Sequence, residues 1–170
     1  IYVSRFGGRR IAVPRDIDRV PSDDGLRTVD LNDGTTDILV SFNDLCALDP
    51  VETMGDGAHW INHVVLSPDG ERVAFFHRWE LADGGTYTRL CAVDPDGSNL
   101  QVVVDTGRVT HYAWRSREEI LAWSRESEVL NEAAKDGGFD NPLVRPVIGL
   151  GRFVLRNITV PSWLVQDVLG

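Results

Sequence analysis

Histidines are the residues of this chain best suited to chemistry, and three of the four fall within one stretch. The segment HWINHVVLSPDGERVAFFHRW, residues 59–79, carries His59, His63 and His77, and His111 follows in THYAW. Neutral imidazole is a common metal ligand, and it can act as a general base near neutral pH. Two interpretations are open: a metal or catalytic site, or a β-hairpin that happens to carry histidines.

The spacing of His59 and His63 is that of two ligands on one face of a helix, as in helical zinc sites. No glutamate follows His59, however, and His63 leads directly into an apolar, β-branched run. We therefore do not expect the pair to form a helical zinc site.

The segments that carry these histidines form a repeat. Residues 62–77 align with residues 110–124, so that His63 falls on His111 at an offset of about 48 residues. A second self-match relates residues 24–34 to residues 88–97. The repeating unit contains short apolar runs with Asp-Gly at the tight turns, which predicts strands. These runs cover residues 63–66, 72–77, 88–94 and 100–105.

Four short strands in a unit of about 45 residues are typical of a β-propeller blade. A β-sandwich also has short strands at regular spacing, but it gives no reason for the self-match. We predict an all-β chain with antiparallel four-stranded units, forming a partial β-propeller of about two and a half blades over residues 1–125. Because a closed ring needs about four to eight blades, the missing blades are expected from a longer chain or from other copies.

Residues 126–170 depart from this strand rhythm and are predicted to be a mostly helical insertion or tail. Good helix formers fill residues 124–135, and residues 141–157 are apolar with three interspersed arginines. These arginines interrupt any stretch long enough to span a membrane. The segment is expected either to pack its apolar face on the rest of the protein or to dock as an interfacial helix.

Composition narrows the class of partner. The net charge is -9 and no basic stripe stands out, so a nucleic-acid partner is not expected. Cys46 and Cys91 are not spaced as a metal or redox pair, and a disulfide between them is not favoured. The first residues lack the apolar segment of a signal peptide, which favours a cytoplasmic location. The chain also begins without Met, and we expect it to be a fragment.

The repeat resembles a known family. LSPDGERVAF at residues 66–75, followed by VDPDGS at residues 93–98, resembles the Ser-Pro-Asp-Gly repeat of TolB-like β-propellers. Within that group, WINHV, FHRW and THYAW resemble propellers of the oligogalacturonate lyase type and relatives of unassigned function. The resemblance covers about residues 24–125 and bears on the fold more than on the chemistry, because one fold hosts many functions.

In a propeller blade the innermost strand begins, and the second strand ends, at the same rim. This arrangement predicts that the polar residues near those strand ends converge at the mouth of the central channel, a usual place for a ligand site. The ligand contacts expected there are His59, His63, Trp79 and Arg125. Structural roles remain open for each: hydrogen bonds between blades, inter-blade packing of tryptophan, and surface ion pairs of arginine.

The resemblance to the lyases implies a particular chemistry. In that family a rim of histidines holds a manganese ion, and a base removes the sugar proton beside a carboxylate to drive β-elimination. By this match the catalytic residues are His77, as base or substrate contact, and Arg78, as a group that grips a substrate carboxylate. His63 and His111 are the implied ligands of Mn²⁺. The glutamates that follow the matching histidines in the family are replaced here by Arg78 and Tyr112.

Two functions therefore remain open. In the first, a propeller module binds an anionic ligand on its histidine-bearing rim, such as an acidic sugar, or it binds a protein partner. In the second, the protein is a Mn-dependent lyase that cleaves uronic-acid oligosaccharides. The altered glutamates favour the first. Either way we expect a small-molecule, oligosaccharide or protein ligand, no nucleic acid, and no transmembrane segment.

Overall fold

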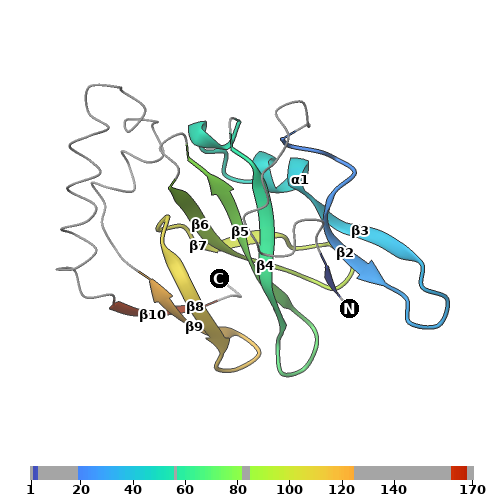
Figure 1. Cartoon of the computed structure of the whole chain (residues 1–170). Helices are drawn as coiled ribbons and strands as arrows, with labels where there is room; N and C mark the ends of the chain where they lie inside the picture. The colour runs from blue at the N-terminus through green and yellow to red at the C-terminus, as the bar shows by residue number, and fades with distance from the viewer. Residues whose placement is uncertain (1, 4–18, 56, 82–84, 125–161, 168–170) are drawn as a thin grey trace.

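The computed structural model describes residues 2–3, 19–55, 57–81, 85–124 and 162–167 of the 170-residue chain. Within these ranges the chain folds into three antiparallel sheets (Figure 1). The middle sheet has the order β4-β5-β6-β7, and the other two have three strands each. The prediction of an all-β chain is confirmed for this part, while the propeller ring itself stays a prediction.

The middle sheet is the repeating unit that the sequence predicted. Its strands are β4 (His59–Leu66), β5 (Val73–Glu80), β6 (Thr86–Val93) and β7 (Gln101–Val104). Each predicted apolar run overlaps one of them. The first strand begins four residues earlier than expected, because Trp60 and Ile61 continue the ladder by pairing with Arg78 and His77.

The flanking sheets are built from shorter strands. One contains β1 (Tyr2–Val3), β2 (Gly25–Val29) and β3 (Thr36–Ser41) in the order β1-β2-β3. The other contains β8 (Val109–Trp114), β9 (Glu119–Ser124) and β10 (Ser162–Asp167) in the order β10-β9-β8.

Strand β10 corrects part of the predicted tail. Residues 162–167 were expected within a mostly helical segment, but they pair antiparallel with β9 from Ser162 opposite Ser124 to Asp167 opposite Glu119. An unpaired strand edge offers a row of N–H and C=O groups, and pairing with it overrides local preference. The rest of the predicted tail, together with Arg125, lies outside the described residues.

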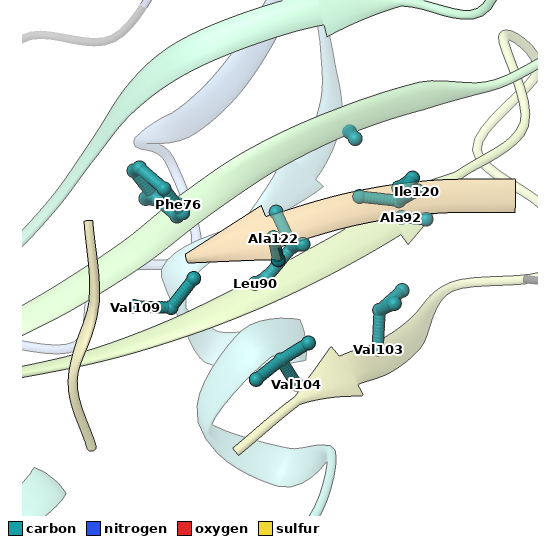
Figure 2. Packing of buried hydrophobic residues seen from close by; sticks show 9 residues of the cluster. Phe76, Leu90, Ala92, Val103, Val104, Val109, Ile120 and Ala122 are labelled. Atoms are coloured by element: carbon teal, nitrogen blue, oxygen red, sulfur yellow. The ribbon is translucent and has the colours of Figure 1, made fainter. Parts of the chain in front are cut away.

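The middle sheet is buried on both faces. On one face its side chains pack with β2, β3 and α1, through Leu26, Val40, Phe42, Leu45, Ile61, Val73, Phe75, Cys91 and Val93. On the other face they pack with β8 and β9 (Figure 2), through Ala74, Phe76, Leu90, Ala92, Val103, Val104, Val109, Ile120 and Ala122. The alternation of Phe75 and Phe76 between the two clusters follows from the two-residue period of a strand.

Two short helical segments connect β3 to β4, and neither was predicted. Helix α1 (Phe42–Ala47) begins at a capping box, in which Ser41 and Asp44 satisfy each other's backbone N–H groups. The 3₁₀ segment η1 (Glu52–Met54) follows and leads into β4. Among the described residues, no helix has the length and apolar character needed to cross a bilayer.

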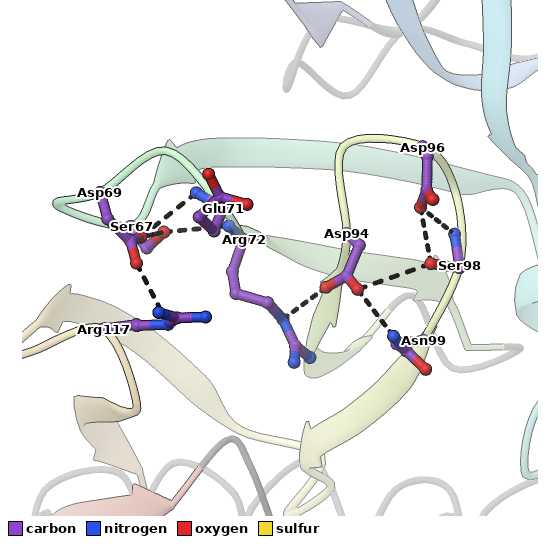
Figure 3. A network of polar contacts seen from close by, with 9 residues as sticks. All are labelled: Ser67, Asp69, Glu71, Arg72, Asp94, Asp96, Ser98, Asn99 and Arg117. Atoms are coloured by element: carbon purple, nitrogen blue, oxygen red, sulfur yellow. Dashed lines mark hydrogen bonds and ion pairs between the residues drawn. The ribbon is translucent and has the colours of Figure 1, made fainter.

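The turn between β4 and β5 lies at the opposite end of the strands from His59. It is closed by a 2.9 Å hydrogen bond from Gly70 N to Ser67 O, which confirms the predicted turn. Nearby, Arg72 Nε lies 3.0 Å from Asp94 Oδ1 and joins this turn to the one between β6 and β7 (Figure 3). Polar contacts therefore join the two turns at this end of the sheet.

Candidate functional site

The structure places the histidines on both faces of the middle sheet. His59 and His77 lie on the face of the middle sheet that carries Phe75 and α1, whereas His63 lies against Phe76 on the other face. The cause is an irregularity in β4 between residues 62 and 65, where His63 adopts a positive φ of 52°. A bulge of this kind re-aims a side chain to the opposite face.

His59, His77 and Arg89 form one buried hydrogen-bond chain. Arg89 Nε donates to His77 Nδ1 at 3.1 Å, so the remaining proton of a neutral His77 is on Nε2. His77 Nε2 lies 2.8 Å from His59 Nδ1, and His59 Nε2 lies 2.7 Å from the Met54 carbonyl. We assign the tautomers from this network: His77 donates to His59, and His59 donates to Met54.

Arg89 also forms hydrogen bonds to the C-terminal end of α1 and so connects the histidines to that helix. Its side chain is fully buried, and its Nη1 donates to the carbonyls of Leu48 at 3.0 Å and Asp49 at 3.1 Å. Its Nη2 donates to the carbonyl of Leu45. Carbonyls at the C-terminal end of a helix carry partial negative charge, so they suit a buried guanidinium.

Burial keeps both histidines uncharged. Burial lowers the pKa of His59 to about 4, with the Met54 carbonyl opposing this shift and the charge of Arg89 adding to it. Burial, His59 and Arg89 together lower the pKa of His77 well below its usual value. His77 is fully buried, and both of its ring nitrogens are hydrogen-bonded. The predicted catalytic base is therefore placed away from solvent.

Cys46 completes a group that sequence reasoning missed. Its Sγ lies 3.8 Å from His59 Nδ1, and the potential ligand atoms of Cys46, His59 and His77 all lie within 4.8 Å of one another. These three residues are close enough to hold a metal ion. Cys46 comes from α1, which was not predicted, and its spacing to His59 matches no metal motif. Cys46 and Cys91 are both free thiols, as expected.

The thiol of Cys46 is protonated when no ion is bound. Burial raises its pKa to about 11, and the charge of Arg89 opposes that shift only in part. A thiol beside a neutral imidazole does not resemble the thiolate–imidazolium pair of a cysteine nucleophile. The raised pKa therefore argues against a cysteine nucleophile at this position.

Trp79 packs against the rings of His59 and His77. Its ring stacks on Tyr87 at a centroid distance of 4.3 Å and on His59 at 5.9 Å, and its Nε1 donates to Thr53 Oγ1 at 3.0 Å. The side chain is fully buried. The structure thus places Trp79 in the core, where it packs and cannot offer a surface to a ligand.

A second group, which we call the cationic face, lies on the other face of the middle sheet: Trp60, His63 and Arg78, with His111 on the neighbouring strand β8 near enough to influence His63. The Arg78 guanidinium carbon lies 4.9 Å from the centre of the Phe76 ring, and the His63 ring lies 5.2 Å from it. Burial lowers the pKa of His63, and the charges of Arg78 and His111 lower it further. Trp60 lies directly across the ladder from Arg78, so the two side chains share a face.

Arg78 is the unusual member of the cationic face. It is half-buried, burial lowers its pKa, and its Nε has no hydrogen-bond partner. Within the part of the chain that the structure describes, no carboxylate forms an ion pair with it. Partly buried arginines are normally paired. Among the described residues, therefore, no acidic group competes with an anion for Arg78.

The expected manganese ligands, His63 and His111, do not belong to the metal-capable group. Among the described residues, the group with three suitable ligand atoms is Cys46, His59 and His77. Its donor set also argues against manganese, because Mn²⁺ prefers oxygen ligands and a thiolate with two imidazoles suits Zn²⁺.

No protein-family model matches the chain, and a search among curated proteins found no match. The resemblance to TolB-like propellers therefore stays a prediction, and the geometry of the two groups is the basis for assigning a function.

Proposed function

We propose that this chain is part of a TolB-like β-propeller and binds an acidic sugar on its cationic face. The observation that carries the proposal is Arg78, a half-buried guanidinium that no described carboxylate pairs with. The chain has 26 acidic residues against 17 basic ones, and none of the acidic residues that the structure describes forms an ion pair with Arg78.

The other members of the cationic face suit the same ligand. A guanidinium can hold a carboxylate through two parallel hydrogen bonds. The half-buried ring of Trp60, across the ladder from Arg78, offers an apolar surface on which a sugar ring can stack. His63 and the exposed His111 add polar groups that can bond hydroxyls or a second carboxylate.

We propose binding and not cleavage. A β-elimination needs a base within reach of the proton it removes. His77, the residue that the family resemblance implied, is fully buried and lies on the opposite face from Arg78. His63 is the remaining imidazole beside Arg78, and no described group orients it as a base.

Calorimetric titration of the chain with trigalacturonate tests the proposal. We expect binding that replacement of Arg78 by Met weakens about 10-fold to 100-fold, because a charged hydrogen-bonding group contributes about 1.5–3 kcal/mol. The matched control is Arg117→Met, which removes an exposed arginine at the far end of the sheet and should leave the affinity unchanged.

Two outcomes would contradict the proposal. One is equal affinity for the neutral galactose trimer, which would show that the carboxylate is not recognised. The other is an Arg78→Met variant that binds as tightly as the unaltered chain. A rise in ultraviolet absorbance during the titration would report an unsaturated product. It would show that the chain cleaves trigalacturonate and does not only bind it.

A further inference from the structure

Independently of the cationic face, we propose that Cys46, His59 and His77 form a binding site for one Zn²⁺ ion. The three residues come from separate elements, α1, β4 and β5, which the fold brings together on one face of the middle sheet. A thiol and two imidazoles at such short separations are the donor set of many zinc sites.

The separations need only small adjustment to accept the ion. Zinc bonds of about 2.0–2.1 Å to nitrogen and 2.3 Å to sulfur place neighbouring tetrahedral ligand atoms roughly 3.3–3.7 Å apart. His77 Nε2 and His59 Nδ1 are 2.8 Å apart, and Cys46 Sγ is 3.8 Å from His59 Nδ1. Spreading the two imidazoles by about half an ångström opens the required space.

The three residues differ in burial. His59 and His77 are 3% and 0% exposed, whereas Cys46 is only partly buried. Cys46 is therefore the most exposed of the three proposed ligands. Three protein ligands leave a fourth tetrahedral position, which a water molecule can fill.

His59 is already arranged as a ligand. Its Nδ1 lone pair faces His77 Nε2, and its Nε2–H donates to the Met54 carbonyl. A backbone carbonyl on the far nitrogen is the usual partner of a zinc-bound imidazole, since it fixes the tautomer and the ring orientation.

His77 and Cys46 must change protonation, and the proton count balances. The Cys46 thiol loses its proton to solvent and becomes the thiolate that binds the ion. His77 moves its proton from Nε2 to Nδ1, which frees the Nε2 lone pair and breaks its hydrogen bond to His59. Arg89 Nε then loses its acceptor on His77, while its Nη groups keep the carbonyls of Leu45, Leu48 and Asp49. Binding thus releases one proton overall.

Cobalt substitution gives the most direct test. The full chain, freed of metal by a chelator, is titrated with Co²⁺ and followed by absorption spectroscopy. We expect one equivalent to bind with a thiolate-to-cobalt charge-transfer band and the intense visible bands of tetrahedral cobalt, all removed by an equivalent of Zn²⁺. Cys46→Ser should abolish the charge-transfer band, and Cys91→Ala, which removes the other thiol, should retain it. Circular dichroism confirms that each variant is folded.

Further variants separate this site from the cationic face. A double variant, His63→Gln with His111→Gln, should keep the cobalt spectrum, and Arg78→Met should keep it as well. The proposal is overturned if the folded chain takes up no cobalt, if the charge-transfer band survives in Cys46→Ser, or if the double variant loses the spectrum. Failure of trigalacturonate binding has no bearing on these outcomes.

Discussion

Arg89 shows how one buried residue organises a site without touching solvent. Its guanidinium is fully buried, yet the described hydrogen bonds join it to one imidazole and three backbone carbonyls, with no carboxylate among these partners. These hydrogen bonds therefore replace the hydrogen bonds to water that the guanidinium loses on burial. In the absence of metal, the same residue fixes the tautomer of His77 and, through it, that of His59.

Replacement of Arg89 by Met is expected to reduce the free energy of unfolding by about 3 kcal/mol or more. The change leaves His77 Nδ1, the buried Leu45 carbonyl and the partly buried carbonyls of Leu48 and Asp49 without this donor, and each unsatisfied buried group costs about 1–3 kcal/mol. Urea unfolding followed by tryptophan fluorescence measures the loss. Arg117→Met is the control, since an exposed arginine changes stability by no more than about 0.5 kcal/mol. Equal midpoints for the two variants would contradict this role of Arg89.

At the scale of single residues, the sequence identified candidate side chains but did not show which of them lie together. His59, Arg78 and His63 were all selected, and each occupies one of the two groups described here. The separation of His63 from His59 depends on a positive φ at a non-glycine residue, which residue type does not reveal. The role of Cys46 depends on three elements meeting in space.

The bulge in β4 also connects the middle sheet to β8. Around it, the Tyr112 hydroxyl donates to the carbonyls of His63 and Ala74, the latter at 2.7 Å, and Trp114 Nε1 donates to the carbonyl of Val65 at 3.2 Å. A bulge locally disrupts the ladder and can leave backbone groups unpaired. Side chains from the neighbouring sheet satisfy them here, so the bulge that re-aims His63 also ties the two sheets together.

Removal of the Tyr112 hydroxyl, as in Tyr112→Phe, should reduce the free energy of unfolding by about 1–2 kcal/mol. The ring can keep its edge contact with Phe76, at a centroid distance of 5.0 Å, so the loss reports the hydrogen bonds alone. Thermal or urea unfolding measures it. Thr110→Ala, an exposed change on the same strand, serves as the control. A Tyr112→Phe variant as stable as the control would mean that water replaces the hydroxyl at both carbonyls.

At the scale of elements, prediction succeeded where the signal was local. The strands of the middle sheet and the turn at residues 67–70 follow from short apolar runs of strand length and from Asp-Gly, and the structure contains them. Helix α1 carried a local signal as well, Ser41 with Asp44 in a capping box, but it is only six residues long. Strand β10 depends on pairing with β9, which is far away in the sequence.

At the scale of the whole molecule, the stacking of sheets separates two kinds of chemistry. The face toward α1 encloses the buried group of Cys46, His59, His77 and Arg89, and the face toward β8 presents the cationic face. The chain as a whole has a net charge of -9, so its long-range field repels anions. Salt at about 0.15 M screens that field beyond roughly 8 Å, which leaves the local groups to decide whether an anion binds.

The affinity for trigalacturonate is expected to rise as the pH falls from 7.5 to 5.5. Burial, Arg78 and His111 lower the pKa of His63 below its ordinary value of 6.5, so His63 is neutral near pH 7. A carboxylate bound beside it stabilises the protonated imidazole and raises this pKa. Proton uptake is therefore coupled to binding, and binding becomes several-fold tighter as the pH falls through the range where His63 titrates.

Replacement of His63 by Gln isolates this effect. Acidification also makes the whole chain less negative, but it does so equally in both proteins, so the difference between their pH profiles reports His63. Calorimetric titrations at pH 7.5, 6.5 and 5.5 should give a steep rise for the unaltered chain and a shallower one for His63→Gln. Parallel profiles would show that His63 takes up no proton on binding, and the anion would then be held by Arg78 without its help.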